Sequence, residues 1–297
     1  MRTFILLLIA SSSFGQGYVD LFRFTQAMTP QMPIEGEGGR TSLPETMIDA
    51  NIPVPVGHGR YLLTGGAYEQ FQIRFMDTIH LRAKTGLLKV GMQWSSGEKD
   101  TWMLMALPRF SSDGSIRSAQ DMQWGGMMTF KHKKHERFNW QVGVYANTER
   151  SGPFVVPMVG WWWRSANERW ESSALLPLNA DVHYRSPAGW RMGTVFVSMV
   201  KSYQLHGTYF QALDPYMVKS NNEVFGYVQT KPYKGFILQL RVGRSIGRSI
   251  KLYANQERYD LGVSAFKLGD DRKWLNPLFP DGGVAQIRLI YRLETAP

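Results

Sequence analysis

Apolar and polar residues alternate one by one in short runs along most of this chain. In "QFQIRF", Phe71, Ile73 and Phe75 share one face, while Gln72 and Arg74 share the other. The same period of two recurs in "GLLKVGMQW", "RFNWQVGVYA", "GFILQLRVG" and "VAQIRLIYRL". Such alternation is typical of β-strands that have one apolar and one polar face. It predicts an all-β protein.

Short polar segments such as "SSGEKD", "KHKKHER", "RSANER" and "TKPYKG" separate these runs. Their spacing predicts about 12 strands, with about 14 as the alternative, each of the length that a tilted membrane strand needs. Longer connections are expected at residues 30–44, 205–222 and 269–283. No linker interrupts the pattern, which predicts a single domain over residues 16–297.

Two β architectures produce this pattern, and they differ in which face is dry. A soluble sandwich buries its apolar face, whereas a membrane barrel turns that face to lipid. The polar faces here mix Gly, Gln, Asn and Ser with scattered charges, and Gly91, Gly143 and Gly193 suit a crowded barrel interior. Aromatic residues near strand ends are typical of membrane interfaces. The sequence therefore favours a transmembrane antiparallel up-and-down β-barrel, with a secreted glycan-binding β-sandwich as the alternative.

Composition narrows the choice of partners and chemistry. The mean hydropathy of −0.27 is ordinary, as expected of strands that alternate lipid-facing and lumen-facing residues. The chain has no cysteine, which excludes disulfides and thiolate zinc sites. Its net charge of +10 is spread along the chain, so no nucleic-acid partner is expected.

The N-terminus, "MRTFILLLIASSSFGQG", predicts export. Arg2 precedes an apolar run, and Ser13 and Gly15 stand where a signal peptidase requires small residues. Residues 1–15 are therefore expected to be a signal peptide that is cleaved before Gln16. Export and a barrel together predict location in the outer membrane.

One block, "GPFVVPMVGWWWRSANERWESSALLPLNADVHYRS", resembles a block in an uncharacterised family of Bacteroidota outer-membrane β-barrel proteins, a domain of unknown function. "RYLLTGGAYEQFQ" and "VAQIRLIYRL" are also similar. The resemblance implies an outer-membrane barrel and carries no activity, cofactor or catalytic residue. One departure is the ending "RLETAP", since many such barrels end in an aromatic residue; here the nearest is Tyr291. The expected partners are outer-membrane lipid, lipopolysaccharide, the barrel-assembly machinery and possible other outer-membrane proteins.

Candidate catalytic residues lie in "NADVHYR". Asp181 and His183 share a strand face and, with Ser173, have the residue types of a lipid-modifying outer-membrane enzyme. Positions two apart on a strand are about 7 Å apart, too far for a direct hydrogen bond unless the side chains reach toward each other. His132 and His135 lack an acidic or thiolate companion for a metal. No enzyme activity, metal or cofactor is expected, and the lipid-modifying enzyme stays an alternative.

Basic residues on the polar faces predict a positively charged lumen. An open lumen of this kind makes a porin-like, anion-preferring channel for small solutes. In a packed lumen the same residues form ion pairs, and the barrel is structural or a scaffold. The expected lumen-lining residues are Arg74, Lys89, Arg241, Arg288 and Arg292.

The tryptophans in "GWWWRSANERW" raise a separate question. Alternation places Trp161 and Trp163 on one face and Trp162 on the other, and Trp170 follows the turn. This arrangement is typical of anchors at a membrane interface. The next strand is expected to run from Trp170 to Tyr184 with its apolar face toward lipid, and Tyr184 to reach the opposite interface as a further anchor. Trp162 is expected to face the lumen, where it must plug, pack or stack.

Overall fold

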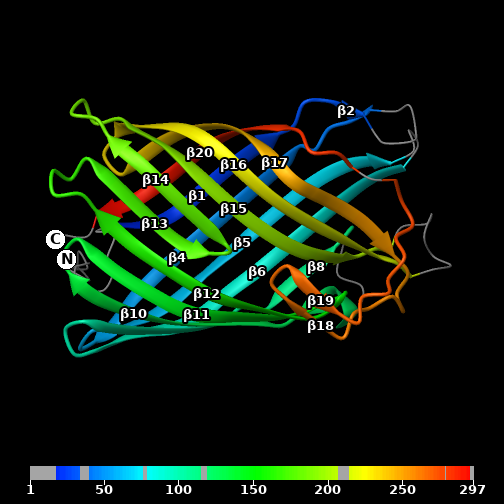
Figure 1. Cartoon of the computed structure of the whole chain (residues 1–297), viewed down its shortest axis with the longest axis horizontal. Coiled ribbons are helices and arrows are strands. Elements are labelled where there is room, and N and C mark those ends of the chain that lie inside the picture. The colour runs from blue at the N-terminus through cyan, green and yellow to red at the C-terminus, as the bar shows by residue number, and fades with distance from the viewer. Residues whose placement is uncertain are drawn as a thin grey trace, which may run out of the picture.

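The computed structural model describes residues 18–33, 40–75, 79–114, 119–206, 214–277 and 279–294. In this part of the chain fourteen antiparallel strands form a closed barrel, because the first strand pairs with the last (Figure 1). The predicted all-β barrel is confirmed, with 14 strands rather than about 12, and the β-sandwich alternative is wrong. The predicted signal peptide, residues 1–15, lies outside the described residues.

The wall strands are β1 (Tyr18–Met28), β4 (Glu45–Gly57), β5 (Arg60–Phe75), β6 (Ile79–Ser96), β7 (Asp100–Ala106), β10 (Gly125–His135), β11 (Phe138–Glu149), β12 (Gly152–Arg164), β13 (Trp170–Leu176), β14 (Asn179–Arg185), β15 (Arg191–Gln204), β16 (Tyr216–Tyr233), β17 (Phe236–Tyr253) and β20 (Gly283–Glu294). Shorter elements lie in the connections: β2 (Met32–Pro33), β3 (Arg40–Thr41), β8 (Arg109–Ser112), the 3-10 turn η1 (Ala119–Asp121), β9 (Met122–Gln123), β18 (Leu261–Val263) and β19 (Phe266–Leu268). The described residues contain no helix long and apolar enough to span a bilayer.

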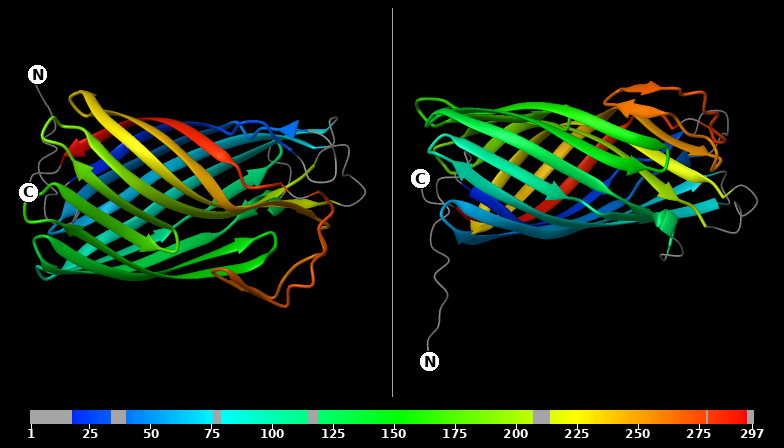
Figure 2. Two further views of the ribbon diagram at one scale, coloured as in Figure 1. Left: turned by 45° about the horizontal axis from the view of Figure 1, so that its top comes forward. Right: turned by 90° about the horizontal axis from the view of Figure 1, so that it is seen from below.

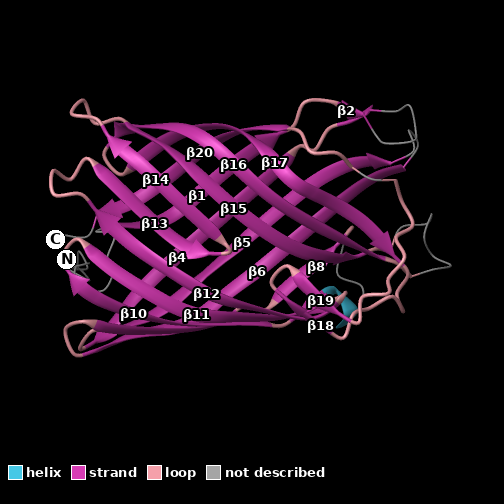
Figure 3. Cartoon of the chain, in the orientation of Figure 1, coloured by secondary structure: helices cyan, strands magenta, loops and turns pink. Residues whose placement is uncertain are grey.

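The two ends of the barrel differ in the length of their connections. Tyr18 pairs with Glu294, so β1 begins and β20 ends at the same end, which we name the terminal end. Figure 3 shows tilted strands along the whole length between this end and the opposite one, the loop end. Connections at the terminal end have two to five residues. Those at the loop end include residues 29–44, 107–124, 205–215 and 254–282.

The predicted long connections are only partly correct. The first one matches within a residue, but the second is shorter because β16 already begins at Tyr216, and the third begins earlier, after Tyr253. The connection at residues 107–124 was not predicted. It contains β8, which pairs with β6. The connection therefore has no long irregular stretch that would mark it in the sequence.

The outer face near the terminal end is apolar. Leu88 is 60% exposed and Val242 is 71% exposed, as expected of side chains that face lipid rather than a core. Further exposed apolar residues extend this band around the barrel: Ile52, Val54, Val90, Leu104, Val142, Val144, Val159, Val182, Met192, Leu240, Ile287 and Leu289.

At the loop end the two faces exchange roles. Phe71 and Ile73 are 1% and 2% exposed and pack inside, whereas Gln72 between them is exposed. The apolar side of "QFQIRF" therefore faces the interior rather than lipid, a correction to the simple barrel pattern. Twelve buried residues form this loop-end core and fill the interior there: Met32, Leu43, Phe71, Ile73, Leu81, Ala83, Tyr203, Leu205, Met217, Ile250, Leu252 and Phe279.

The connection between β17 and β20 folds back over the outside of the wall (Figure 2). Its β18 pairs in parallel with β12, through Phe154 and Gly262. Arg272 lies 4.4 Å from the ring centre of Tyr253 and forms two hydrogen bonds with Asp270, of 2.6 and 3.0 Å. The hydrogen bonds from Arg272 hold the pKa of Asp270 below its ordinary value. These contacts fix the loop against the barrel.

Candidate functional site

The barrel encloses a cavity of about 1010 Å³ between the loop-end core and the terminal end. Residues of twelve wall strands and of the long loop line it. Among the described residues, ten lysines and arginines and six acidic residues line it. The basic ones are Arg23, Arg109, Arg191, Lys201, Arg241, Lys251, Lys267, Arg272, Arg288 and Arg292. Three of these cations, Lys251, Lys267 and Arg272, lie on the outer side of the wall, at the loop between β17 and β20, so seven face the lumen. The lumen thus contains basic residues, as the sequence predicted, and acidic residues nearly match them in number.

Two of the predicted lumen-lining cations are neutralised by ion pairs. Lys89 contacts the carboxylate of Asp49, and Arg292 donates to Asp20 at 2.6 and 3.1 Å. Both cations thus form the ion pairs that were expected of a packed lumen. The side chain of Arg74 lies outside the described residues.

The other two have no such partner. The Nε atom of Arg241 and the Nη1 atom of Arg288 each donate to the Oε1 atom of Gln239, both at 2.8 Å. Arg288 also donates to Thr25, and both guanidinium groups are less than 10% exposed. In the described part of the chain neither lies within 4.0 Å of a carboxylate. The two buried cations thus share one neutral amide and have no carboxylate in direct contact. We name Arg241, Arg288 and Gln239 the guanidinium pair site.

The catalytic candidates are brought together only in part. The Nδ1 atom of His183 lies 2.7 Å from Oδ1 of Asp181, so the side chains have the reach that a direct hydrogen bond requires. The side chains lean toward each other along the strand, and glycine at position 193 makes room, since a Cβ there would lie 2.6 Å from that of His183. Ser173 pairs with Asp181 across the strands, but Nε2 of His183 has no hydrogen-bond partner among the described residues. A Ser–His–Asp relay is therefore not assembled.

No group of three or more His, Cys, Asp or Glu side chains in the described ranges is arranged to hold a metal ion. His132, one of the two turn histidines, lies 2.7 Å from Asp100. Asp100 belongs to the neighbouring strand β7, so this acidic companion does not show in the sequence around His132.

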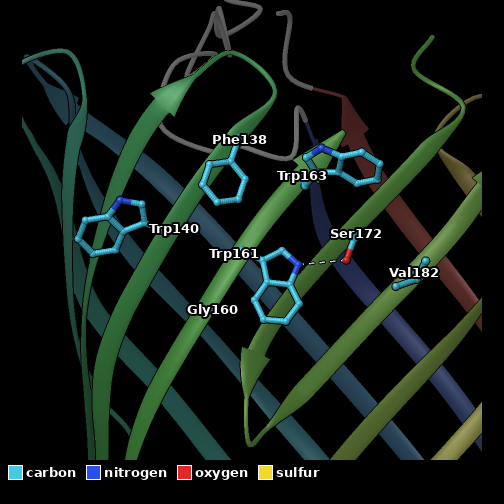
Figure 4. Close-up of a pocket in the computed structure, with 7 residues that line it drawn as sticks. All are labelled: Phe138, Trp140, Gly160, Trp161, Trp163, Ser172 and Val182. Carbon is cyan, nitrogen blue, oxygen red and sulfur yellow. Dashed lines mark hydrogen bonds between the residues drawn. The ribbon is translucent and has the colours of Figure 1, made fainter. Parts of the chain in front are cut away.

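The tryptophans of β12 divide between the two faces as expected. Trp163 is 41% exposed on the outer face, whereas Trp162 is 5% exposed inside, where the guanidinium of Arg164 lies 5.0 Å from its ring centre. Trp162 therefore packs and stacks within the lumen. Figure 4 shows Trp161 beside Ser172, to which its Nε1 atom donates at 3.1 Å. The outer groove of about 600 Å³ is lined by Phe138, Trp140, Gly160, Trp161, Trp163, Ser172 and Val182.

The position of Tyr184 is a correction. The stretch from Trp170 to Tyr184 is not one strand, because it turns back at residues 177–178. Tyr184 consequently pairs with Trp170, their ring centres 5.2 Å apart, at the terminal end rather than the opposite interface. Further aromatic pairs follow this end around the wall: Trp102–Phe130, Phe130–Trp140, Tyr233–Phe236 and Phe236–Tyr291. The terminal end thus has an aromatic belt.

Replacing Trp170 with alanine is expected to lower the stability of the barrel in phosphatidylcholine vesicles by about 1 kcal/mol, because the ring pair with Tyr184 is lost. Urea unfolding in vesicles measures this loss. Val182→Ala, at an exposed outer position within the apolar band, is the control. Equal losses for the two variants would show that Trp170 is not an interfacial anchor.

Sequence reasoning missed two members of the site. Gln239 and Thr25 were not singled out, although Gln239 stands two residues before Arg241 in "GFILQLRVG", on the same polar face. Thr25 lies directly opposite Arg288 in the register of β1 and β20. The alternation could have placed both in the lumen, but only the strand pairing shows that they meet Arg288.

The fold defines the class of protein: an up-and-down β-barrel of the transmembrane kind. No family model and no curated protein matches the chain. Among solved structures, a match titled as the crystal structure of Acinetobacter baumannii OccAB4 has 8% identity and a TM-score of 0.28, and covers 92% of this chain and 97% of that one. A bacterial polysaccharide outer membrane secretin has 10% identity, a TM-score of 0.28, and coverage of 92% and 99%. Likenesses at this level identify neither a function nor a partner.

Proposed function

We propose that this protein is a non-enzymatic outer-membrane β-barrel whose lumen binds small anionic solutes. The apolar outer band, the aromatic belt and the even strand number support insertion in the outer membrane. Short turns and both chain ends face the periplasm in such barrels, so the terminal end is periplasmic and the loop end extracellular. The resemblance to the Bacteroidota family agrees with this location and stays a prediction.

One observation carries the anion-binding function: the guanidinium pair site holds two buried cations without a carboxylate. Guanidinium groups bind carboxylates and phosphates through paired, charge-assisted hydrogen bonds. A bound anion would supply the charge that Gln239 lacks. The loop-end core packs inside the barrel toward the extracellular side. We infer from it that the straight path is closed, which favours a binding lumen over an open axial channel.

The Arg241→Gln, Arg288→Gln double variant is expected to weaken binding of methyl phosphate by about tenfold or more, because each lost charge-assisted hydrogen bond is worth about 1.5–3 kcal/mol. The measurement is the rise of the unfolding midpoint with methyl phosphate in neutral detergent, at constant ionic strength. Lys89→Gln is the matched control, since Lys89 is a lumenal cation already paired with Asp49. The affinity of the Lys89→Gln variant for methyl phosphate should change much less.

Three outcomes separate the functions. No stabilisation of the wild-type barrel by methyl phosphate would leave a purely structural or scaffolding barrel. Equal losses in the double variant and in Lys89→Gln would show a diffuse charge effect instead of a site. Lipid turnover that stops in His183→Ala would favour the lipid-modifying enzyme.

A further inference from the structure

We propose that the lumenal cavity opens sideways through the barrel wall and takes up the acyl chain of an anionic amphiphile. Its headgroup binds at the guanidinium pair site, so the inference rests on the proposed function for that part. It adds the class of ligand, a lipid-like molecule with a phosphate or carboxylate head, and the route by which such a molecule enters from the bilayer.

The opening follows from two short strands. β13 and β14 have seven residues each, whereas their neighbours β12 and β15 have 13 and 14. β12 pairs with β13 only as far as Val159, and β15 pairs with β14 only as far as Val197. Figure 1 shows their turn partway along the barrel. Beyond it, in the described part of the chain, no wall strand joins the facing edges of β12 and β15, and β18 pairs with the β12 edge only at Phe154 and Val155. We name this gap the window.

Hydrogen bonds hold the frame of the window in place. We name the border nearer the terminal end the floor and the opposite border the roof. At the floor the backbone N–H of Ser198 donates to the carbonyl of Leu178 at 2.8 Å. At its roof the N–H of Ser202 donates to the carboxylate of Glu149 at 2.9 Å. On the β12 side the N–H of Ser264 donates to the carbonyl of Val155 at 3.0 Å, which places the turn between β18 and β19 at the window.

The cavity reaches the window and passes through it. Leu178 at the floor and Val200 on β15 line the cavity, as do Ser264 and Ala265 of the loop. Lys201, next to Val200, points inward to contact Glu69. Successive strand residues point to opposite faces, yet both Val200 and Lys201 line this one cavity. The same cavity includes Ser220 and Ser249, which lie beside Val200 in register on the outer face of β16 and β17.

The window lies at the level of lipid chains. Pro157 on its edge is six residues along β12 from Trp163 of the aromatic belt. A strand rise of about 3.3 Å per residue and a tilt of about 40° place it roughly 15 Å above that belt, within an apolar band about 25 Å tall. A soluble ion does not cross lipid to reach such an opening, but an acyl chain lies there already.

The lining of the window matches an amphiphile. An apolar cluster of β12 meets side chains of the floor and of β15, a surface that suits an acyl chain. From the floor strand, Asp181 accepts a hydrogen bond of 3.2 Å from Tyr227, which pairs with Arg241 on β17. A chain in the window thus leads to a headgroup at the guanidinium pair site. The apolar residues are Phe154, Val156, Met158, Leu175, Leu178 and Val200.

Binding of dodecyl phosphate and of methyl phosphate, each measured as a midpoint shift in neutral detergent, tests the route. The wild-type barrel should bind dodecyl phosphate about tenfold or more tightly, because burying only a few methylene groups gives that factor. Two variants block the window: Val200→Cys reacted with a bulky maleimide, and Ala265→Trp on the loop. The chain has no other cysteine, so labelling is specific. Each block should remove the advantage of the long chain and leave methyl phosphate binding unchanged.

Val144→Cys with the same maleimide is the matched control, since this exposed residue lies on intact wall; it should bind both phosphates like the wild type. Heat-modifiable migration on a gel verifies that each variant is folded. The sideways route is wrong, but the anion site is retained, in two cases. In the first, methyl phosphate binds and the dodecyl chain adds no affinity. In the second, neither blocking variant lowers the affinity for dodecyl phosphate. If methyl phosphate does not bind, the anion site itself fails. Dodecyl phosphate binding that survives in Arg241→Gln, Arg288→Gln places the headgroup elsewhere and overturns the proposal.

Discussion

The Glu149→Ala variant is expected to lose about 3–5 kcal/mol of unfolding free energy, because it leaves the buried guanidinium of Arg109 without its counter-charge. The two side chains are 1% and 6% exposed and lie 2.5 Å apart. The same carboxylate accepts hydrogen bonds from Asn147 and from the backbone and hydroxyl of Ser202. Urea unfolding in vesicles measures the loss.

Glu149 also joins the turn after β11 to β15 at the roof of the window. Adding Glu149→Ala to the Val200→Cys variant should therefore speed the reaction of its cysteine with a membrane-permeant maleimide, compared with Val200→Cys alone. Glu136→Ala is the control, since Glu136 forms an ion pair with Lys133 at 85% exposure, where such pairs contribute little. A loss as small as that of the control would mean that Glu149 does not hold the frame.

Phe71→Ala is expected to destabilise the barrel by about 3–5 kcal/mol, the range for deleting a buried aromatic ring. The ring of Phe71 is 1% exposed, lies edge-on to Tyr203 with centres 5.3 Å apart, and is 4.4 Å from Nζ of Lys219. Leu88→Ala, at an outer position 60% exposed to the surroundings, is the comparison. The loss of stability should be larger for Phe71→Ala than for Leu88→Ala, because Phe71 packs in the interior and Leu88 faces lipid.

Chemical unfolding followed by tryptophan fluorescence measures both variants. A loss below about 0.5 kcal/mol for Phe71→Ala, within the usual range of surface substitutions, would show that the loop-end core is not packed. The axial path would then be open, contrary to the fold described above.

The barrel could be predicted from the alternation because period two is a local property of each strand. The face that is dry could not, since the same period results whether the apolar side faces lipid or the interior. That ambiguity explains the misplaced Phe71 and Ile73 at the loop end. Their environment depends on loop residues such as Leu43, which come from a distant part of the chain.

The strand count and the site show a second limit. Treating residues 170–184 as one strand overlooked Pro177, although a proline within an apolar run argues against a continuous strand. Charge pairing was not accessible at all: Lys219 contacts Glu45, 174 positions away. Whether a lumenal arginine is paired or free depends on such distant neighbours, so the sequence predicted Arg241 and Arg288 as lumenal but not as unpaired.

We propose that the lumen binds anions while the loop-end core closes its straight path to the extracellular side. Single-channel recording of the wild-type barrel in planar phosphatidylcholine bilayers tests it most directly. We expect no steady current at either polarity, while methyl phosphate still raises the unfolding midpoint of the same preparation. A steady anion-selective current through the wild-type barrel would contradict it.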